Sequence, residues 1–173
     1  MPERFERDDF HRGAVTARIM ALAKTSQAKM LVVDDDELEL ALLCDRLESC
    51  GLDVRRATNG AEALALLEKE WFPVVLTDWQ MPVMSGVEMT EQLRARGAHD
   101  TYVIMLTVLD SGFDYERAYE AGVDDYLNKK RPEVELLARV HAAFSTVSLR
   151  RQLREAREKL LDLTQSTTTA SPT

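Results

Sequence analysis

The chain has little cysteine, no long apolar run and no apolar leader. Only Cys44 and Cys50 are cysteines among its 173 residues, and neither belongs to a CxxC pair, so a disulfide framework and a cysteine zinc site are excluded. No apolar run approaches the roughly 20 residues that span a bilayer. The first ten residues, MPERFERDDF, lack the apolar core of a signal peptide. We therefore expect a cytoplasmic chain with no membrane partner.

The chain also lacks an excess of positive charge and the glycine-rich motifs that bind nucleotides. Its 22 Lys and Arg residues stand against 30 Asp and Glu residues, for a formal net charge of −8. This balance argues against nucleic acid as a partner, because nucleic-acid binding needs a cationic surface. Neither GxGxxG nor the P-loop pattern GxxxxGK(S/T) occurs, so no nucleotide is indicated.

Short apolar runs alternate with helical stretches from residue 29 onward. Continuous apolar runs are typical of strands buried on both faces of a parallel sheet. They predict strands at 30–33, 52–57, 73–77, 102–107 and 125–128. Leucine and alanine spacing predicts helices at 37–50, 61–70, 86–96 and 111–121, and a long helix from Pro132. The predicted fold class is α/β, a five-stranded parallel sheet that is doubly wound, with right-handed connections.

Polar residues follow these strands directly, at the sheet edge where ligands of such folds bind. They are Asp34, Asp35 and Asp36, then Asp78, Thr107 and Lys129. Clustered carboxylates repel one another, and a divalent cation relieves the repulsion. Mg²⁺ keeps several waters and leaves room for phosphate oxygens. Carboxylates, a metal, a hydroxyl and a lysine suit phosphoryl transfer, in which an aspartate can itself be the nucleophile.

Each of these residues, taken alone, has an ordinary structural role. An Asp after a strand often caps the next helix, and we expect Asp36 to do so. A Thr at a strand end is usually a β-former, and a single Lys is usually a solvated charge. Their coincidence at four strand ends favours the functional interpretation, because the strand-end rule selects positions without reference to chemistry.

Four segments resemble the receiver domain of two-component response regulators, in a layout similar to the single-domain chemotaxis receiver. They are MLVVDDD at 30–36, VVLTDWQMPVMSG at 74–86, VIMLT at 103–107 and AGVDDYLNKK at 121–130. The second is highly specific, with Met-Pro and Gly at fixed offsets after the Asp. The resemblance covers residues 29–147. It implies a flavodoxin-like (βα)5 fold with strand order 2-1-3-4-5, Mg²⁺ as cofactor, and a sensor histidine kinase or histidine phosphotransfer protein as phosphodonor.

The resemblance also implies a role for each matching residue. Asp78 would accept the phosphoryl group. Asp35 would bind Mg²⁺ directly and Asp34 largely through water, with Asp78 and the backbone carbonyl of Gln80 as further ligands. Thr107 would hydrogen-bond the phosphate, Lys129 would pair with it, and Tyr126 matches the aromatic residue whose rotamer follows the threonine. Such a chain would be a switch that catalyses only its own phosphorylation and dephosphorylation, not a metabolic enzyme.

Two positions depart from the family pattern. Lys130 stands where the family usually has a proline after a cis peptide bond, and a cis bond before another residue costs about 3 kcal/mol. Either this bond is trans and the loop differs, or strain is held there. Val108 stands where the residue after the threonine is usually small, and its stiff β-branched side chain is expected to restrict the access of water to an acyl phosphate.

The segments outside the receiver are expected to differ in structure. Residues 1–28 would form an extension with a short helix at 14–24, with Val15, Ile19 and Leu22 on one face. Residues 148–164 would extend the last helix, and residues 165–173 would form a disordered tail. A 4-3-4-3 spacing of apolar residues predicts a coiled-coil homodimer through the extended helix; these residues are Leu149, Leu153, Ala156, Leu160 and Leu163. The downstream partner would be a separate protein or an output domain absent from this sequence.

Two alternatives remain open. In the first, the chain is a phosphatase of the haloacid-dehalogenase type, because Asp34 and Asp36 faintly match its DxDx(T/V) signature. This alternative leaves the segment after Asp78 unexplained, and it lacks the acidic pair required at a strand end after Lys129. In the second, the departures at Val108 and Lys130 mark a degenerate site in an interaction module that is not phosphorylated.

Overall fold

Five parallel strands form the centre of the computed structural model, which describes residues 13–21, 28–108 and 112–168. Their order is β2-β1-β3-β4-β5, and every neighbouring pair is parallel. The predicted fold class and strand order are therefore confirmed. The strands are β1 Lys29–Val33, β2 Asp53–Ala57, β3 Val74–Asp78, β4 Tyr102–Thr107 and β5 Asp125–Asn128.

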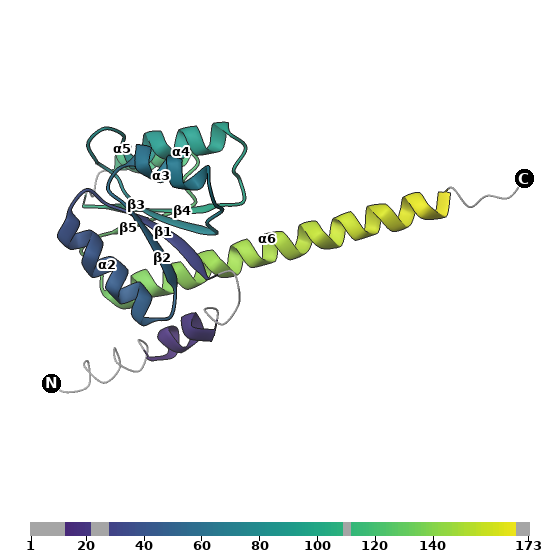
Figure 1. The fold of residues 1–173 in the computed structure, drawn as a ribbon, viewed down its shortest axis with the longest axis horizontal. Coiled ribbons are helices and arrows are strands. Elements are labelled where there is room, and N and C mark those ends of the chain that lie inside the picture. Colours follow the sequence, from purple (N-terminus) through teal and green to yellow (C-terminus); the bar gives the residue numbers. More distant parts are fainter. Residues whose placement is uncertain (1–12, 22–27, 109–111, 169–173) are drawn as a thin grey trace, which may run out of the picture.

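Helices cover both faces of the sheet (Figure 1). Successive strand side chains point to opposite faces, and they divide between two apolar clusters. Met30 and Val32 belong to the cluster that includes residues of α2 (Glu37–Ser49) and α6 (Glu133–Thr168). Leu31 and Val33 belong to the cluster that includes residues of α3 (Gly60–Leu67), α4 (Gly86–Ala95) and α5 (Gly112–Glu120). Burial on both sides is the physical reason for the unbroken apolar runs.

Side-chain caps begin three of the helices. Asp36 accepts hydrogen bonds from the backbone N–H groups of Leu38 and Glu39, which confirms its expected role as the cap of α2. Asn59 caps α3, and Ser85 caps α4 in a reciprocal capping box with a glutamate. The prediction placed Asp78 just after its strand, but the backbone of Asp78 pairs with Leu106, so β3 includes it.

A helix over residues 13–21 completes the cluster beneath α2 and α6 (Figure 1). Ile19 is fully buried in this cluster, and Val15 packs against it. The predicted helix at 14–24 therefore begins one residue earlier and uses the predicted apolar face, while Leu22 lies outside the described residues. Part of the predicted N-terminal extension thus contributes to the core of the predicted receiver.

The last helix, α6, leaves the body of the protein as one continuous rod (Figure 1). Its first half packs on the sheet through buried apolar residues as far as Val147, and every residue from Leu149 to Thr164 is exposed. The helix continues to Thr168, so residues 165–168 of the predicted tail are helical, and residues 169–173 lie outside the described part. Within the described ranges, no helix is both long and apolar enough to cross a membrane.

Candidate functional site

Three aspartates meet at the edge of the sheet where β1 and β3 end. Asp34 and Asp35 follow β1, and Asp78 is the last residue of β3. Because β1 and β3 pair with Val33 opposite Thr77, the residues that follow come side by side. Carboxylate oxygens of Asp34, Asp35 and Asp78 lie within 4.8 Å of one another. The convergence expected from the strand ends is therefore observed, and we call these residues the acidic trio.

The members of the acidic trio differ in burial. Asp34 is only 1% exposed, Asp78 is half-buried and Asp35 is exposed. The Oδ1 atom of Asp34 accepts a hydrogen bond of 3.0 Å from the backbone N–H of Asp36, which holds this buried carboxylate in place. The exposed Asp35 leaves one side of the trio open to solvent, so a hydrated cation or a phosphate group can reach it.

The ammonium group of Lys129 lies against two members of the acidic trio. Its Nζ atom is 2.8 Å from Asp34 Oδ2 and 3.3 Å from Asp78 Oδ1. The lysine directly follows β5, and its backbone N–H donates a hydrogen bond of 2.8 Å to the carbonyl of Thr107. The end of β4 therefore positions the lysine, whose charge offsets part of the negative charge concentrated at this edge.

Glu39 is a member of the site that the strand-end rule missed. Its Oε2 atom lies 2.7 Å from Lys129 Nζ, and it stands in the first turn of α2, three residues after the capping Asp36. A helix that begins at a strand end presents its first turn to the same edge, and acidic residues are favoured there by the helix dipole. That signal was present in the sequence.

The pKa values of Asp78 and Lys129 reflect burial and mutual contact. Burial raises the pKa of Asp78, the charge of Lys129 and a backbone hydrogen bond from Trp79 lower it, and the charge of Asp34 raises it. Burial lowers the pKa of Lys129, but its hydrogen bonds with Asp34 and Glu39 outweigh burial and hold it above the ordinary lysine value. Lys129 is therefore charged at neutral pH. Its single positive charge does not balance the three carboxylates of the acidic trio, so the site favours a further cation.

The other predicted site residues lie within or shortly after β3, β4 and β5. Thr107 ends β4, is 3% exposed, and pairs in register with Asn128, so it shares the edge with Lys129. Val108 is 56% exposed and Tyr126 is 45% exposed, and Gln80 is exposed two residues after Asp78. The roles of Val108, Tyr126 and the Gln80 carbonyl as gate, switch and metal ligand remain predictions.

A glycine allows α4 to begin against the end of β3. A Cβ atom on Gly86 would lie 2.1 Å from the carbonyl oxygen of Asp78, which no side chain tolerates. The backbone N–H of Gly86 donates a hydrogen bond of 3.0 Å to the carbonyl of Trp79, and the N–H of Trp79 donates one of the same length to Leu106. These contacts fix the backbone on both sides of the Asp78 carboxylate.

The loop after β5 is built around Asn128 and not around a cis peptide bond. In the described residues every peptide bond is trans, so of the two alternatives for Lys129–Lys130 the trans bond is observed. The Asn128 side chain accepts a hydrogen bond of 2.8 Å from the N–H of Lys130, and its carbonyl accepts one of 2.9 Å from Arg131. This is an Asx turn. A proline has no N–H to donate, so Lys130 supplies a contact that the family's usual residue cannot.

The fold and the site together define a class of protein. An open, doubly wound parallel sheet that gathers carboxylates and a lysine at its carboxyl edge is suited to hold a divalent cation and a phosphate group. The model of the response regulator receiver domain matches residues 30–141. The chain belongs to this family, whose members are signalling modules of two-component systems.

Similar proteins agree with this assignment. The alkaline phosphatase synthesis transcriptional regulatory protein PhoP of Bacillus subtilis is 40% identical over 114 residues, which cover 66% of this chain and 47% of PhoP. The receiver domain of the Francisella response regulator 1452 has 34% identity and a TM-score of 0.64, covering 68% of this chain and 97% of that one. A structure described as adenylate cyclase from Rhodopirellula baltica has 30% identity and a TM-score of 0.70, covering 77% and 98%.

The chain spans about half the length of the curated relatives it matches. The matches therefore establish that this chain contains a receiver domain. The activities of the longer relatives are not assigned to this chain. The matches give no support to the phosphatase alternative, because the family and the relatives it resembles are response regulators.

Proposed function

We propose that the chain is a phosphorylation-controlled switch whose phosphoacceptor is Asp78. The observation that carries this proposal is the acidic trio at one sheet edge, with Lys129 in contact with both Asp34 and Asp78. The proposed donor is a phosphohistidine of a sensor kinase or phosphotransfer protein. The proposed downstream partner is a target protein, an output domain or a second copy of this chain.

In the proposed transfer, a carboxylate oxygen of Asp78 forms a bond to phosphorus while the phosphorus–nitrogen bond of the donor breaks. The donor imidazole keeps the electron pair of that bond, so nothing is oxidised or reduced. Asp78 is an effective nucleophile only when ionised, and the charge of Lys129 favours ionisation by lowering a pKa that burial raises. The chain would catalyse this step and the later hydrolysis only on itself.

The acidic trio fits Mg²⁺ as the cofactor. Its donors are carboxylate oxygens within 4.8 Å of one another, and the exposed Asp35 leaves room for the waters that Mg²⁺ retains. We propose Asp35, Asp78 and the Gln80 carbonyl as direct ligands, with Asp34 acting largely through water. The bound ion would offset the charge of the phosphoryl oxygens.

Phosphorylation of Asp78 would change the surface of the receiver through three residues, Thr107, Lys129 and Tyr126. The Thr107 hydroxyl and the Lys129 ammonium would donate to the phosphate oxygens, and hydrogen bonds to an ionised acceptor are the strong ones. Lys129 would give up part of its contact with Asp34 and Glu39 to do so. Tyr126 is 45% exposed, and its ring would turn inward toward the space that Thr107 leaves when it moves to the phosphate.

We propose a cytoplasmic location, supported by the two buried free cysteines, which suit a reducing compartment. PhoP is named a transcriptional regulatory protein, but the match covers 47% of it, so DNA binding is not part of the proposal. The formal net charge of −8 also argues against nucleic acid as a partner.

Labelling with radioactive acetyl phosphate in the presence of Mg²⁺ tests the proposal. The wild-type chain should be labelled, Asp78→Asn should not, and Asp35→Asn should require more Mg²⁺. Asp53→Asn is a matched control, because Asp53 is exposed at the opposite end of the sheet, and it should be labelled like the wild type. Full labelling of Asp78→Asn would place the acceptor elsewhere. A wild-type chain labelled by neither acetyl phosphate nor a phosphohistidine donor would favour the degenerate interaction module.

A further inference from the structure

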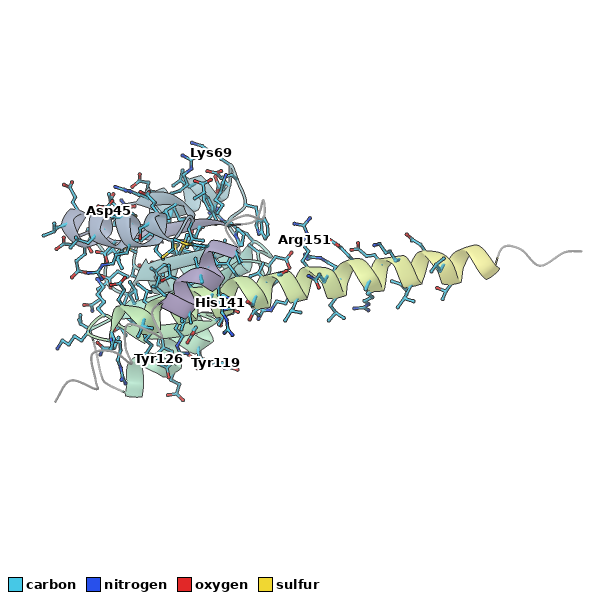
Figure 2. All side chains as sticks on the ribbon, turned by 90° about the horizontal axis from the view of Figure 1, so that it is seen from below. Asp45, Lys69, Tyr119, Tyr126, His141 and Arg151 are labelled. Atoms are coloured by element: carbon cyan, nitrogen blue, oxygen red, sulfur yellow. The ribbon has the colours of Figure 1, made fainter. Side chains whose placement is uncertain are left out.

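The last helix carries an apolar stripe that no other described part of the chain covers. Figure 2 shows this part of α6 extending past Arg151 with no other described segment beside it. We call residues 149–163 the stem. Its stripe, which we call the seam, consists of Leu149, Leu153, Ala156, Leu160 and Leu163, and the four leucines are 64–73% exposed.

The seam points away from the body of the receiver. Successive helix residues are turned by about 100°, which places the seam about 180° around the axis from the buried face of α6. That face is made by Leu136, Leu137, Val140, Ala143, Phe144 and Val147. Arg150 and Arg154 lie on the side of the helix that faces the receiver. Arg150 forms an ion pair with Asp124, and Arg154 forms one with Asp100. A second helix can therefore lie along the seam without meeting the receiver to which the stem belongs.

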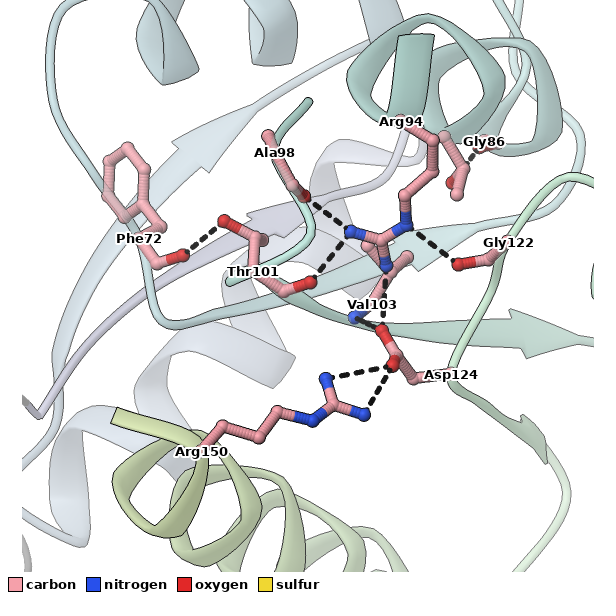
Figure 3. A network of polar contacts seen from close by, with 10 residues as sticks. Phe72, Gly86, Arg94, Ala98, Thr101, Val103, Gly122, Asp124 and Arg150 are labelled. Atoms are coloured by element: carbon pink, nitrogen blue, oxygen red, sulfur yellow. Dashed lines mark hydrogen bonds and ion pairs between the residues drawn. The ribbon is translucent and has the colours of Figure 1, made fainter. Parts of the chain in front are cut away.

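A polar network fixes the root of the stem to the sheet (Figure 3). Both terminal nitrogens of Arg150 donate to Asp124 Oδ1, at 3.3 Å each. Asp124 Oδ2 also accepts a hydrogen bond of 2.7 Å from Arg94. Arg94 in turn donates to the carbonyls of Ala98, Thr101 and Gly122. The direction of the seam is therefore set by the folded receiver.

We propose that the seam pairs with the seam of a second copy of the chain, in parallel, as a short two-stranded coiled coil. Its spacing assigns Leu153 and Leu160 to a positions, and Leu149, Ala156 and Leu163 to d positions. The parallel arrangement places both receivers at the same end of the paired stems, on opposite outer sides. This pairing rests on the proposed function only in that it specifies one of the proposed partners, a second copy of the chain. The pairing itself does not require phosphorylation of Asp78.

The charges beside the seam select the parallel orientation. The acidic residues of the stem stand at c and f positions, and its e and g positions hold Arg150, Gln152, Arg157 and Lys159. In a parallel pair, Gln152 faces Arg157 of the second copy and Lys159 faces Thr164 of the second copy, so like charges do not meet. In an antiparallel pair with matched leucines, Arg157 meets its own counterpart and Lys159 does the same, which is repulsive.

The seam is short, so the pairing should be weak and depend on concentration. Burial of a leucine removes about 100 Å² from water, so the leucines of two copies bury about 800 Å², a size typical of transient contacts. Two heptads are also fewer than the three or four usual for a sustained coiled coil, and Ala156 leaves a central layer underfilled. Association should thus be measurable at high micromolar concentrations and above.

Sedimentation equilibrium of the full, unphosphorylated chain tests the proposal over roughly 10 µM to 1 mM. Ala156→Leu fills the central layer and should strengthen association about tenfold or more, and Leu153→Glu should weaken it by a similar factor. Leu161→Glu is the matched control, because Leu161 is 50% exposed on the same stem but lies outside the seam; it should associate like the wild type. All three positions are exposed, so the receiver should fold alike in each variant.

Cysteine crosslinking tests the orientation. Cys44 and Cys50 are buried, so an introduced cysteine supplies the accessible thiol. Leu153→Cys chains should form a disulfide with one another in a parallel pair, whereas an antiparallel pair would link Leu153→Cys to Leu163→Cys in a mixture. The proposal is overturned by a preferential mixed disulfide, by equal losses in Leu153→Glu and Leu161→Glu, or by a monomer at every concentration even with Ala156→Leu. A stem that pairs only with an added acidic helical peptide would also overturn it. None of these outcomes bears on whether Asp78 is labelled by acetyl phosphate.

Discussion

Replacing Lys129 with methionine removes the positive charge that contacts Asp34 and Asp78 while keeping a side chain of similar length. The side chains of Lys129 and Asp34 are 16% and 1% exposed, so this pair is largely but not fully buried. Removal of one partner of a buried ion pair costs about 3–5 kcal/mol, because the other charge stays buried without compensation. Asp78 can take up a proton, which favours the lower figure. A loss of about 3 kcal/mol is a large part of the 5–15 kcal/mol typical of a folded domain and should lower the melting temperature by about 10 °C.

The loss should shrink as the pH falls. Burial raises the pKa of Asp78 and Lys129 opposes this, so the pKa of Asp78 should be higher still in Lys129→Met. When a carboxyl has a higher pKa in the folded than in the unfolded state, the folded state binds the proton more tightly. Stability then rises as the pH falls from that raised pKa toward the unfolded value of about 3.9. Mg²⁺ should also restore stability at neutral pH, because it binds the folded state.

Urea unfolding followed by far-ultraviolet circular dichroism measures both effects, at neutral pH and near pH 5. Lys130→Met is the matched control, because Lys130 is the exposed neighbour of Lys129 and contributes only its backbone N–H to the Asn128 turn. Its free energy of unfolding should stay close to that of the wild type. If Lys129→Met were as stable as Lys130→Met, the short contacts of Lys129 would contribute nothing and the reasoning would be wrong.

Three further substitutions test other parts of the site. Asp78→Asn should raise the melting temperature without metal, because it relieves carboxylate repulsion, and should reduce the stabilisation by Mg²⁺ in a thermal shift assay; an unchanged response would show that Asp78 is not a ligand. Val108→Ala should shorten the lifetime of phosphorylated Asp78 about tenfold if the bulky side chain adds about 1.4 kcal/mol to the approach of water; an equal or longer lifetime of the radiolabel would remove Val108 as the gate. Gly86→Ala should lower the free energy of unfolding by about 3 kcal/mol, because its Cβ would lie 2.1 Å from the Asp78 carbonyl oxygen; a variant as stable as the wild type in urea would contradict that steric argument.

The sheet and the acidic trio could be predicted because each depends on a local signal. An apolar run such as Met30–Val33 without alternation indicates a strand covered on both faces, and the burial of all four residues bears this out. Aspartates that follow such strands must share an edge once the sheet is parallel. The position of Asp34 beside Asp78 therefore follows from register alone.

The features that escaped prediction depend on contacts between distant segments. Nothing near Ile19 in the sequence indicates that it fills the cluster beneath α2 and α6. The first turn of α2 indicates that Glu39 lies at the same edge of the sheet, but its contact with Lys129, 90 residues along the chain, is visible only in the folded structure. The turn at Asn128 is indicated by its side chain, which favours Asx turns, but its partner, the backbone N–H of Lys130, is visible only in the folded loop.

The uninterrupted course of α6 fixes a rotational phase between the receiver and the seam. The helix has 36 residues, so it is about 54 Å long at 1.5 Å per residue. One residue inserted after Val147 would turn the seam, together with Arg150 and Arg154, by about 100° relative to the buried face of α6. Seven inserted residues would return the seam to within about 20° of its first direction while moving it about 10 Å outward. The distance of the seam from the receiver and its rotation about the helix axis can therefore be varied separately in this protein. Both quantities would also set the position of any segment joined to the stem.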